Sequence, residues 1–469
     1  MNRKLIIILG LALVLRLITL NQSFWLDEAI GAITVRNLSF HDVLINFPKG
    51  DNHPPLYYAM LDVWGQMFGY SEVGLRSLSV IFGAATVLFT YKIALLLWRN
   101  KNTALIAALL IATSQFHVYY SQEARMYVVA GFFASTAVYY FLKFIEKNLL
   151  LDLVLFSVSI TASVFSDYVP VLLLPIFPIY ILIHKRKLFL KTVLSYLPIV
   201  FLGVLWFPIF VIQSTGGAAF LQALPAWKEI AGGATPKQAL LVWTKFTLGR
   251  ISFDDKSFYY TLLTLVSLPF IGAFVTTWTK KLSKEEKLIW MWLLFPLIVG
   301  FVASFIFPLF NYFRFVFVVP AFYLLIAKAK KRYLSFVLVI NLMSLGAYYF
   351  LPMEQREDWR GAMNMIENNI SETEIVLFTN PEPFAPFRFY NDQNINAIGV
   401  LDSVKIDPIR AAEETKLLTE DKNGVYYFRY LSDLMDPTGI VKATIEENFT
   451  VKEVYNFSGG LGQVYYYRK

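Results

Sequence analysis

Two adjacent carboxylates, Asp27 and Glu28, directly follow the first apolar stretch of the sequence. A carboxylate within hydrogen-bond reach of a hydroxyl group can remove its proton while the oxygen attacks another centre. Acidic residues are also common at the start of a helix, where they face the positive end of the helix dipole. The residues alone leave both a catalytic and a structural interpretation open for this pair.

A histidine lies further along the same polar segment, at His53, and Pro54, Pro55 and Leu56 follow it. Because proline is favoured at the first position of a helix, Pro55 predicts a helix that begins here. His53 is a candidate for substrate binding. Packing or capping at the start of this helix is the alternative.

Two arginines stand where apolar segments meet polar ones: Arg125, with Tyr127 just after it, and Arg314. A guanidinium group presents a planar fork of donors that matches a phosphate group. Both arginines are therefore candidate phosphate ligands, although a long side chain can also simply extend toward lipid headgroups. Asp167, beside Tyr168, occupies a similar polar turn and is a further candidate for substrate binding.

The composition sets the class of protein that must position these groups. Hydrophobic residues make up 57% of 469 positions and charged residues only 16%, so long apolar runs dominate the chain. Runs of about 20 residues can cross a bilayer as helices. The net charge of +8 lies in short clusters between these runs, as in cytoplasmic loops, so we expect no nucleic-acid partner. The absence of Cys excludes disulfides and thiolate catalysis.

The apolar runs predict an α-helical polytopic membrane protein with about eleven transmembrane helices. The runs lie near residues 5–20, 76–98, 103–120, 125–144, 149–166, 168–184, 191–213, 258–279, 288–308, 312–327 and 333–351. Basic clusters alternate between the loops, and the positive-inside rule assigns those at Lys185, Lys280 and Lys281 to the cytoplasm. The amino terminus is then cytoplasmic, whereas the long loops 21–75 and 213–257 and the tail are extracytoplasmic.

We expect two domains. Residues 1–351 form the transmembrane domain, with both long outer loops, and residues 352–469 form a small extracytoplasmic α/β domain. The tail predicts strands near 374–378, 395–401 and 424–430, helices near 358–368 and 408–419, and a hairpin over 451–467. This topology puts all seven candidate residues, from Asp27 to Arg314, at the outer face.

Four motifs carry a family resemblance: Trp-Leu-Asp-Glu-Ala at 25–29, His-Pro-Pro-Leu-Tyr at 53–57, Glu-Ala-Arg-Met-Tyr at 123–127 and the late Arg314. Together they resemble the GT-C glycosyltransferases related to protein O-mannosyltransferases and aminoarabinose lipid A transferases. The resemblance runs from the first residue to about 350. The segment Glu357-Asp358-Trp359-Arg360 is similar to the one that opens the outer domain in many members.

The resemblance implies a cell-membrane enzyme that transfers a sugar, with inversion, from an undecaprenyl or dolichyl phosphate donor to a hydroxyl-bearing lipid, glycan or protein acceptor. Asp27 is then the general base. Arg125 and Arg314 stabilise the phosphate that leaves. The remaining candidates for substrate binding are Glu28, His53, Tyr127 and Asp167.

We expect no cofactor, because the candidate residues show no metal-binding spacing, and a divalent ion, which some GT-C enzymes use, is the alternative. A transporter or flippase of lipid-linked sugars would also need many spans and outer arginines. Such proteins usually place polar groups at mid-membrane in broken helices, whereas here they gather at one rim, which favours an enzyme. A catalytically silent homologue that serves as a scaffold is a third alternative.

The topology is testable because the chain has no Cys of its own. Cys introduced at Ser257 or Ser403 should react with an impermeant thiol reagent applied from outside. Cys at Lys185 or Lys330 should react only after the membrane is permeabilised. Labelling of the tail only after permeabilisation would contradict the assigned orientation.

Overall fold

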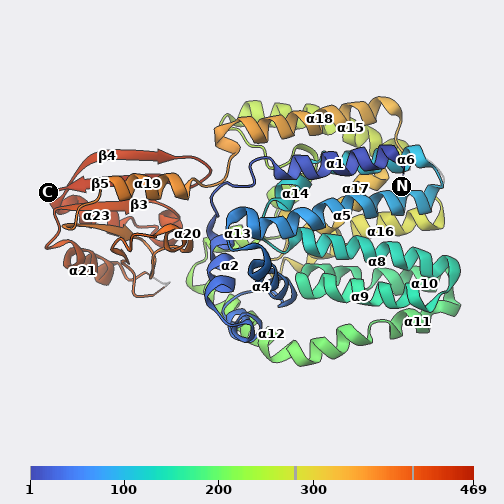
Figure 1. Cartoon of the computed structure of the whole chain (residues 1–469), viewed down its shortest axis with the longest axis horizontal. Coiled ribbons are helices and arrows are strands. Elements are labelled where there is room, and N and C mark those ends of the chain that lie inside the picture. Colours follow the sequence, from blue (N-terminus) through green and yellow to red (C-terminus); the bar gives the residue numbers. More distant parts are fainter. Residues whose placement is uncertain (1, 279–281, 404–405) are drawn as a thin grey trace. The chain divides into compact units, whose positions relative to one another are not determined.

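The computed structural model describes residues 2–278, 282–403 and 406–469. Contacts group them into two compact units, which are described separately (Figure 1). Unit 1 comprises Met1–Leu20, Leu38–Gln213 and Glu229–Phe350, and unit 2 comprises Asn21–Asn37, Ser214–Lys228 and Leu351–Lys469. Lys280 and Lys281, which we predict in a cytoplasmic loop, lie outside the described residues.

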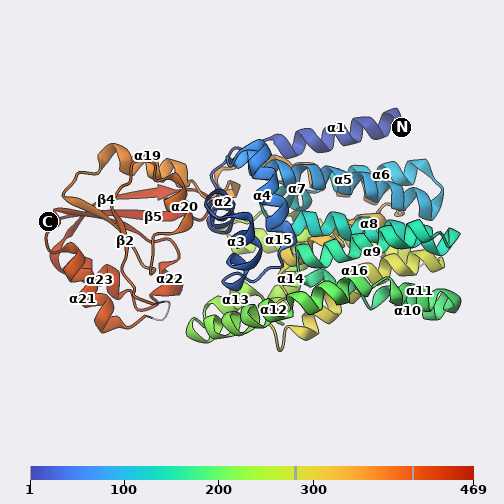
Figure 2. The same ribbon diagram turned by 60° about the horizontal axis from the view of Figure 1, so that its bottom comes forward.

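Unit 1 is helical, and its longer helices run side by side (Figures 1 and 2). Its elements are α1 (Arg3–Leu17), α3 (Phe40–Ile45), η1 (Phe47–Lys49), α4 (Leu56–Phe68), α5 (Glu72–Trp98), α6 (Lys101–Ala112), α7 (Gln115–Ser121), α8 (Tyr127–Lys147), α9 (Leu150–Ser166), η2 (Val169–Leu173), α10 (Ile176–His184), η3 (Arg186–Leu188), α11 (Phe189–Leu194), α14 (Pro236–Leu248), α15 (Lys256–Trp278), α16 (Lys284–Ala303), η4 (Tyr312–Val318), α17 (Val319–Ile326) and α18 (Lys331–Phe350). Two helices, α12 (Leu197–Ala223) and α13 (Trp227–Ala231), have residues in both units.

Helical segments occur at all eleven predicted places, but their lengths differ. Among the described residues, six helical segments are long and apolar enough to cross a membrane, and a seventh span is the bent pair α6 and α7. The remaining four places hold shorter segments, such as α1 with 15 residues, which rises about 22 Å. The prediction of a helical multi-pass membrane protein is confirmed, although several segments are shorter than the sequence predicted.

The bend between α6 and α7 measures 61° and falls at Thr113 and Ser114. Ser114 begins α7, since its hydroxyl accepts a hydrogen bond from the backbone N–H of His117 at 3.4 Å. A side-chain cap of this kind lets a helix restart after a break. The bend therefore starts a new helix, and Arg125 follows that helix by a few residues.

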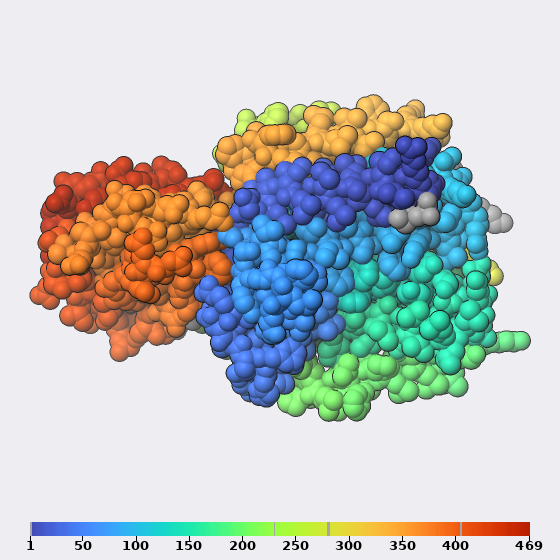
Figure 3. Space-filling model, in the orientation of Figure 1, coloured from blue at the N-terminus to red at the C-terminus, as the bar shows by residue number. Residues whose placement is uncertain are grey.

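The first helix, α1, is fixed to its neighbours through polar contacts. Arg16 is fully buried; its Nε donates to the Ser121 hydroxyl at 3.0 Å and its Nη2 lies 2.8 Å from His117 Nδ1. Tyr349 of α18 donates a hydrogen bond to the Leu15 carbonyl, and Figure 3 shows α1 (dark blue) beside α18 (orange). At the end of α1, the guanidinium of Arg76 donates to the Leu20 carbonyl at 2.9 Å. These contacts hold α1 and Leu20 in place within unit 1, and the chain continues from Leu20 into unit 2.

Unit 2 contains a five-stranded sheet of order β2-β1-β3-β5-β4. Its strands are β1 (Glu374–Phe378), β2 (Ala397–Gly399), β3 (Gly424–Phe428), β4 (Thr450–Phe457) and β5 (Gly462–Arg468). β1 pairs in parallel with both β2 and β3, whereas β5 pairs antiparallel with β3 and β4. The predicted strands, the helix at 408–419 and the terminal hairpin are confirmed.

Helices cover both faces of this sheet. One face packs α21 (Pro408–Thr419) and α23 (Ile440–Asn448), and the other packs α19 (Trp359–Asn369) and α20 (Ala385–Tyr390); α22 (Ser432–Met435) is a short turn. β1 and β3 are buried throughout, as expected for strands covered on two sides. Leu26, which opens α2 (Leu26–Asn37), packs against the α19 side, and α2 contacts α20. The contacts therefore group α2, which carries Asp27, with the tail, although α2 and the tail lie far apart in the sequence.

Candidate functional site

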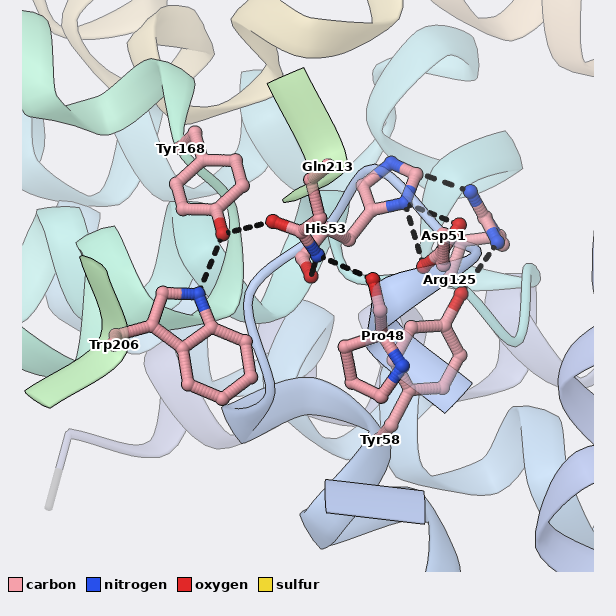
Figure 4. A network of polar contacts seen from close by, with 8 residues as sticks. All are labelled: Pro48, Asp51, His53, Tyr58, Arg125, Tyr168, Trp206 and Gln213. Carbon is pink, nitrogen blue, oxygen red and sulfur yellow. Dashed lines mark hydrogen bonds and ion pairs between the residues drawn. The ribbon is translucent and has the colours of Figure 1, made fainter. Parts of the chain in front are cut away.

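The first polar network lies in unit 1 and surrounds His53 (Figure 4). His53 Nδ1 lies 3.1 Å from an oxygen of Asp51, and His53 Nε2 lies 3.5 Å from Arg125. Arg125 also donates to the hydroxyl of Tyr58 at 3.0 Å. Burial alone would raise the pKa of Asp51, but the charge and hydrogen bond of His53 and the charge of Arg125 outweigh burial and lower that pKa to about 2. Asp51 is therefore ionised over the physiological range, and its contact with Nδ1 fixes the orientation of the His53 ring.

Gln213 of α12 connects this network to the Asp167 turn. Its side-chain amide donates to the carbonyls of Pro48 at 2.8 Å and His53 at 2.9 Å, and its Oε1 accepts from the Tyr168 hydroxyl at 2.6 Å. Trp206 in turn donates to the Tyr168 oxygen at 2.7 Å. The Asp167 carboxylate accepts from the Val169 backbone N–H at 3.1 Å, so in this structure it caps its own turn.

Aromatic rings connect the two predicted phosphate ligands. The Arg125 guanidinium lies 5.9 Å from the ring of Tyr127, and that ring contacts Phe313 at 5.2 Å between centroids. Arg314 lies 5.9 Å from the same Phe313 ring. The η4 segment that carries Arg314 packs closely against α8, since a Cβ added at Gly131 would meet the Phe317 backbone at 3.4 Å. Unit 1 therefore brings Arg125, Tyr127 and Arg314 together through the Tyr127 and Phe313 rings.

A third arginine, Arg250, belongs to the same surroundings, and the sequence analysis did not identify it. Its guanidinium lies 4.7 Å from the ring of Tyr119 and 5.9 Å from that of Tyr312, and it donates to the Tyr120 hydroxyl at 3.4 Å. Tyr120 contacts Tyr127 at 5.6 Å between centroids, which continues the aromatic row. Lys245, mostly buried, also faces Tyr312, at 6.0 Å.

The position of Arg250 depends on the glycine before it. Gly249 has a φ of +82°, and a Cβ there would lie 1.9 Å from Gln115 Oε1, so glycine fits where other residues would clash. The backbone N–H of Arg250 donates to that same oxygen at 2.6 Å. No sequence motif identifies this turn. It is recognised only from the close approach of Gln115 in the structure.

The second polar network lies in unit 2 and contains the predicted carboxylate pair. Glu28 is fully buried, and one of its oxygens lies 3.9 Å from Nη1 of Arg356, which is itself buried. The backbone of the same tail segment is held by Gln22, whose Oε1 accepts from the Arg356 N–H at 3.0 Å. Asp27, in the same first turn of α2, is partly exposed. The Glu28 carboxylate is therefore buried and paired with Arg356, whereas the Asp27 carboxylate is partly accessible to solvent.

A third carboxyl group, Glu357, faces this pair. Its Oε2 accepts from the Trp359 indole N–H at 2.8 Å and its Oε1 from the Tyr430 hydroxyl at 3.0 Å. Burial is the main cause that raises the pKa of Glu357 to about 7, and the negative charges of Asp27 and Glu28 raise it further, against the two hydrogen bonds.

Comparison with known proteins gives matches to the sequence and to the fold. A family profile described as dolichyl-phosphate-mannose-protein mannosyltransferase matches residues 52–212. A relative from Aquifex aeolicus (strain VF5), described as an uncharacterized protein, is 27% identical over 128 residues. That match covers 27% of this chain and spans about a quarter of the relative's length, 25%.

Solved structures match over nearly the whole chain. ArnT from Cupriavidus metallidurans, bound to undecaprenyl phosphate, superposes with a TM-score of 0.57 at 13% identity, over 98% of this chain and 97% of that one. The oligosaccharyltransferase AglB of Archaeoglobus fulgidus, in complex with an inhibitory peptide and a dolichol-phosphate, has a TM-score of 0.52 at 14% identity, over 98% and 74%. The chain has the GT-C fold. The predicted resemblance is confirmed at this level.

Within the GT-C fold, the predicted site residues form two groups. His53, Arg125, Tyr127, Asp167 and Arg314 lie in unit 1, and all but Arg314 fall inside the segment that the family profile matches. Asp27 and Glu28 lie in unit 2. In the part of the chain that the structure describes, no group of three or more His, Asp or Glu side chains is placed to hold a metal ion.

The connection through Gln213 generates a stability prediction. Gln213→Ala should remove three hydrogen bonds from buried or half-buried groups and lower the free energy of unfolding by about 1–3 kcal/mol. Proteolysis in the segment 48–55 should become faster, because its carbonyl contacts are lost. The matched control is Gln66→Ala, since Gln66 is exposed and its amide donates to Asp62 at 2.7 Å. Equal melting temperatures for the two variants in detergent would show that Gln213 does not hold this loop.

Proposed function

We propose that the protein is a membrane glycosyltransferase that moves a sugar from a polyprenyl-phosphate donor to a hydroxyl acceptor on the outer face, with inversion. The GT-C fold, the mannosyltransferase profile over residues 52–212 and the apolar helices support this class of enzyme. Two of the matched structures are complexes with undecaprenyl phosphate and dolichol-phosphate, and we extend that class of lipid carrier to this chain.

The observation that carries the proposal is the row of cations over tyrosine and phenylalanine rings in unit 1. Arg125, Arg314 and Arg250 each approach an aromatic ring, and the rings contact one another through Tyr127 and Tyr120. Guanidinium groups suit a lipid phosphate through paired, charge-assisted hydrogen bonds, and the rings fix each side chain without neutralising it. Arg125 is in addition oriented by Tyr58 and His53.

Asp27 serves as the general base in this proposal. Its carboxylate takes the proton of the acceptor hydroxyl while the oxygen attacks the anomeric carbon. The bond from that carbon to the carrier phosphate breaks, and the phosphate leaves with its electron pair. Arg125 and Arg314 stabilise the negative charge that grows on it, so no separate acid and no covalent sugar intermediate are needed. Glu28, paired with Arg356 and buried, holds the first turn of α2 in place.

The chemistry is tested by Asp27→Asn, which keeps the shape of the side chain and removes the base. Single-turnover transfer in nanodiscs should fall by about 10² to 10⁴, the usual share of general base catalysis. Donor binding and melting temperature should stay near wild type. Asp421→Asn, at an exposed carboxylate of the same unit, is the control and should transfer normally. Near-normal transfer by folded Asp27→Asn would remove Asp27 as the base and favour the transporter alternative.

The phosphate ligands are tested by Arg125→Ala and Arg314→Ala. Each should weaken donor binding by about tenfold or more, because a charge-assisted hydrogen bond contributes about 1.5–3 kcal/mol. Lysine at either position should restore binding only in part, since it lacks the planar fork. The matched control is Arg332→Ala: Arg332 also lies over a tyrosine ring, Tyr333 at 4.7 Å, but in the segment that we place in the cytoplasm. Normal binding of a prenyl-phosphate sugar by both site variants would exclude them as ligands.

A further inference from the structure

A polar cavity of about 420 Å³ lies within unit 2, between α19 and the loop that follows α20. Its volume falls within the range of about 300–1,000 Å³ that is usual for small-molecule sites. Such sites are mostly lined by apolar side chains, whereas charged and amide side chains predominate here. A ligand of this cavity must therefore be rich in hydrogen-bonding groups.

One wall of the cavity is a face of α19. It is formed by Arg360, Met363, Asn364 and Glu367, whose spacing of three and four residues places them on the same side of a helix. Met363 is buried in the core between α19 and the sheet. Arg360 and Asn364 are exposed and Glu367 is half-buried, so three polar side chains of this wall are accessible to a ligand.

The other wall consists of Tyr390, at the end of α20, and of Asp392 and Gln393 in the loop after it. Two hydrogen bonds hold this loop in shape: the Asn391 amide donates to the Ile395 carbonyl at 3.0 Å and accepts from the Ile395 N–H at 2.8 Å. A loop that is ordered before binding lowers the entropic cost of holding a ligand. The cavity is therefore suited to bind without a large rearrangement.

The side chains around the cavity match the surface of a sugar ring. Sugar hydroxyl groups both donate and accept hydrogen bonds, and carboxylate, amide and guanidinium groups offer two polar atoms in one plane. Five of the lining residues carry such groups, and the Tyr390 ring offers an aromatic face on which C–H groups can pack. Two carboxylates outnumber the single guanidinium, so the cavity disfavours an anionic ligand such as a phosphate.

Two of the lining residues also hold the segment that leads to Asp27. Arg360 donates from its backbone N–H to the Ser23 hydroxyl and from its guanidinium to the Asn21 carbonyl, both at 3.1 Å. The Tyr390 hydroxyl accepts from the Phe24 N–H at 2.8 Å. All these residues belong to unit 2, and Phe24 precedes Asp27 by three residues. The cavity is therefore connected directly to the chain segment that carries the proposed base.

We propose that this cavity binds a neutral saccharide, and that this saccharide is the hydroxyl-bearing acceptor. The second part rests on the proposed function, because it takes Asp27 as the base that removes the proton of the acceptor hydroxyl. The first part, saccharide binding by unit 2, is independent of that function. The acceptor is then a glycan or another molecule that already carries a sugar, and an unmodified peptide is not.

Binding is measured by saturation-transfer NMR on the full chain in nanodiscs, since detergents with sugar headgroups would compete. The probes are the methyl glycosides of glucose, galactose, mannose and N-acetylglucosamine, and the ring protons of at least one should receive saturation. Asn364→Ala and Gln393→Ala should each weaken that binding by about two- to tenfold, the usual effect of losing one hydrogen bond. Both positions are exposed, so the melting temperature should stay near wild type.

The matched control is Asn368→Ala. Asn368 is also exposed on α19, but it lies outside the cavity, and its amide donates to the backbone carbonyl of Asn364 at 2.7 Å. This variant should bind the glycoside as wild type does. Saturation of none of the four glycosides would overturn the proposal, and so would equal binding by the control and both cavity variants. Displacement of the glycoside by an unmodified serine-containing peptide would overturn the choice of a saccharide.

Kinetics distinguishes the acceptor sugar from the donor sugar. With the bound glycoside as acceptor, Asn364→Ala and Gln393→Ala should raise KM for the acceptor by the factor seen in binding, while binding of the prenyl-phosphate sugar stays unchanged. Weaker donor binding with an unchanged acceptor KM would show that the cavity holds the donor sugar, and would overturn the assignment to the acceptor.

Failure of this inference can be separated from failure of the proposed function. If Asp27→Asn abolishes transfer to the natural acceptors in membranes while no glycoside binds to the cavity, the saccharide site fails and the proposed function stands. If glycoside binding depends on Asn364 and Gln393 while folded Asp27→Asn transfers normally, the proposed base fails and the saccharide site stands.

Discussion

The buried ion pair between Glu28 and Arg356 is the interaction on which unit 2 depends. A carboxylate that is fully removed from water is costly unless a partner compensates its charge. Glu28 stands near the beginning of the chain and Arg356 near the start of the tail, so this compensation can exist only when the two distant segments fold as one unit. The pair also fixes the first turn of α2, and through it the accessible carboxylate of Asp27.

Unit 1 handles charge in a different way. Arg125, Arg250 and Arg314 lie against tyrosine and phenylalanine rings, which support a guanidinium group from the side. Asp51 contributes a carboxylate to this row through its contact with His53, and Gln213 and Tyr168 connect the His53 segment to neighbouring elements. Unit 1 thus contains cations supported by aromatic rings, and unit 2 contains a buried, paired carboxylate next to a partly exposed one.

Much of this arrangement could be predicted from the sequence, where the signal is local. Apolar length identified the helical segments, and alternation with turn residues identified strands such as Glu374–Phe378 and the terminal hairpin. Asp27, Arg125 and Arg314 were found because charged groups at the ends of apolar runs are unusual. The short α20 and α23 were missed, since helices of 6 and 9 residues depend on packing against the sheet more than on their own pattern.

The residues that could not be predicted share one property: their role depends on a partner far away in the chain. Arg250 is placed by a glycine turn against Gln115. The role of Asp51 is apparent only from its proximity to His53 and Arg125. Glu357 was noticed as part of a family-like segment, but its burial beside Asp27 is a tertiary fact. The shortness of several spans has the same origin, because a helix that is partly enclosed by others need not match the bilayer by its own length.

The buried arginine of α1 has a consequence for how the chain is made. Arg16 lies in the last turn of α1, and a charged side chain in an isolated apolar helix opposes insertion into a bilayer. The groups that satisfy Arg16, Ser121 and His117, are synthesised about a hundred residues later. During translation we therefore expect the first helix to be inserted only weakly in the bilayer. Its position becomes fixed once α7 has been synthesised and contacts Arg16. Biogenesis should then delay the final placement of the segment that carries Asp27 until that later part of the protein has emerged from the ribosome.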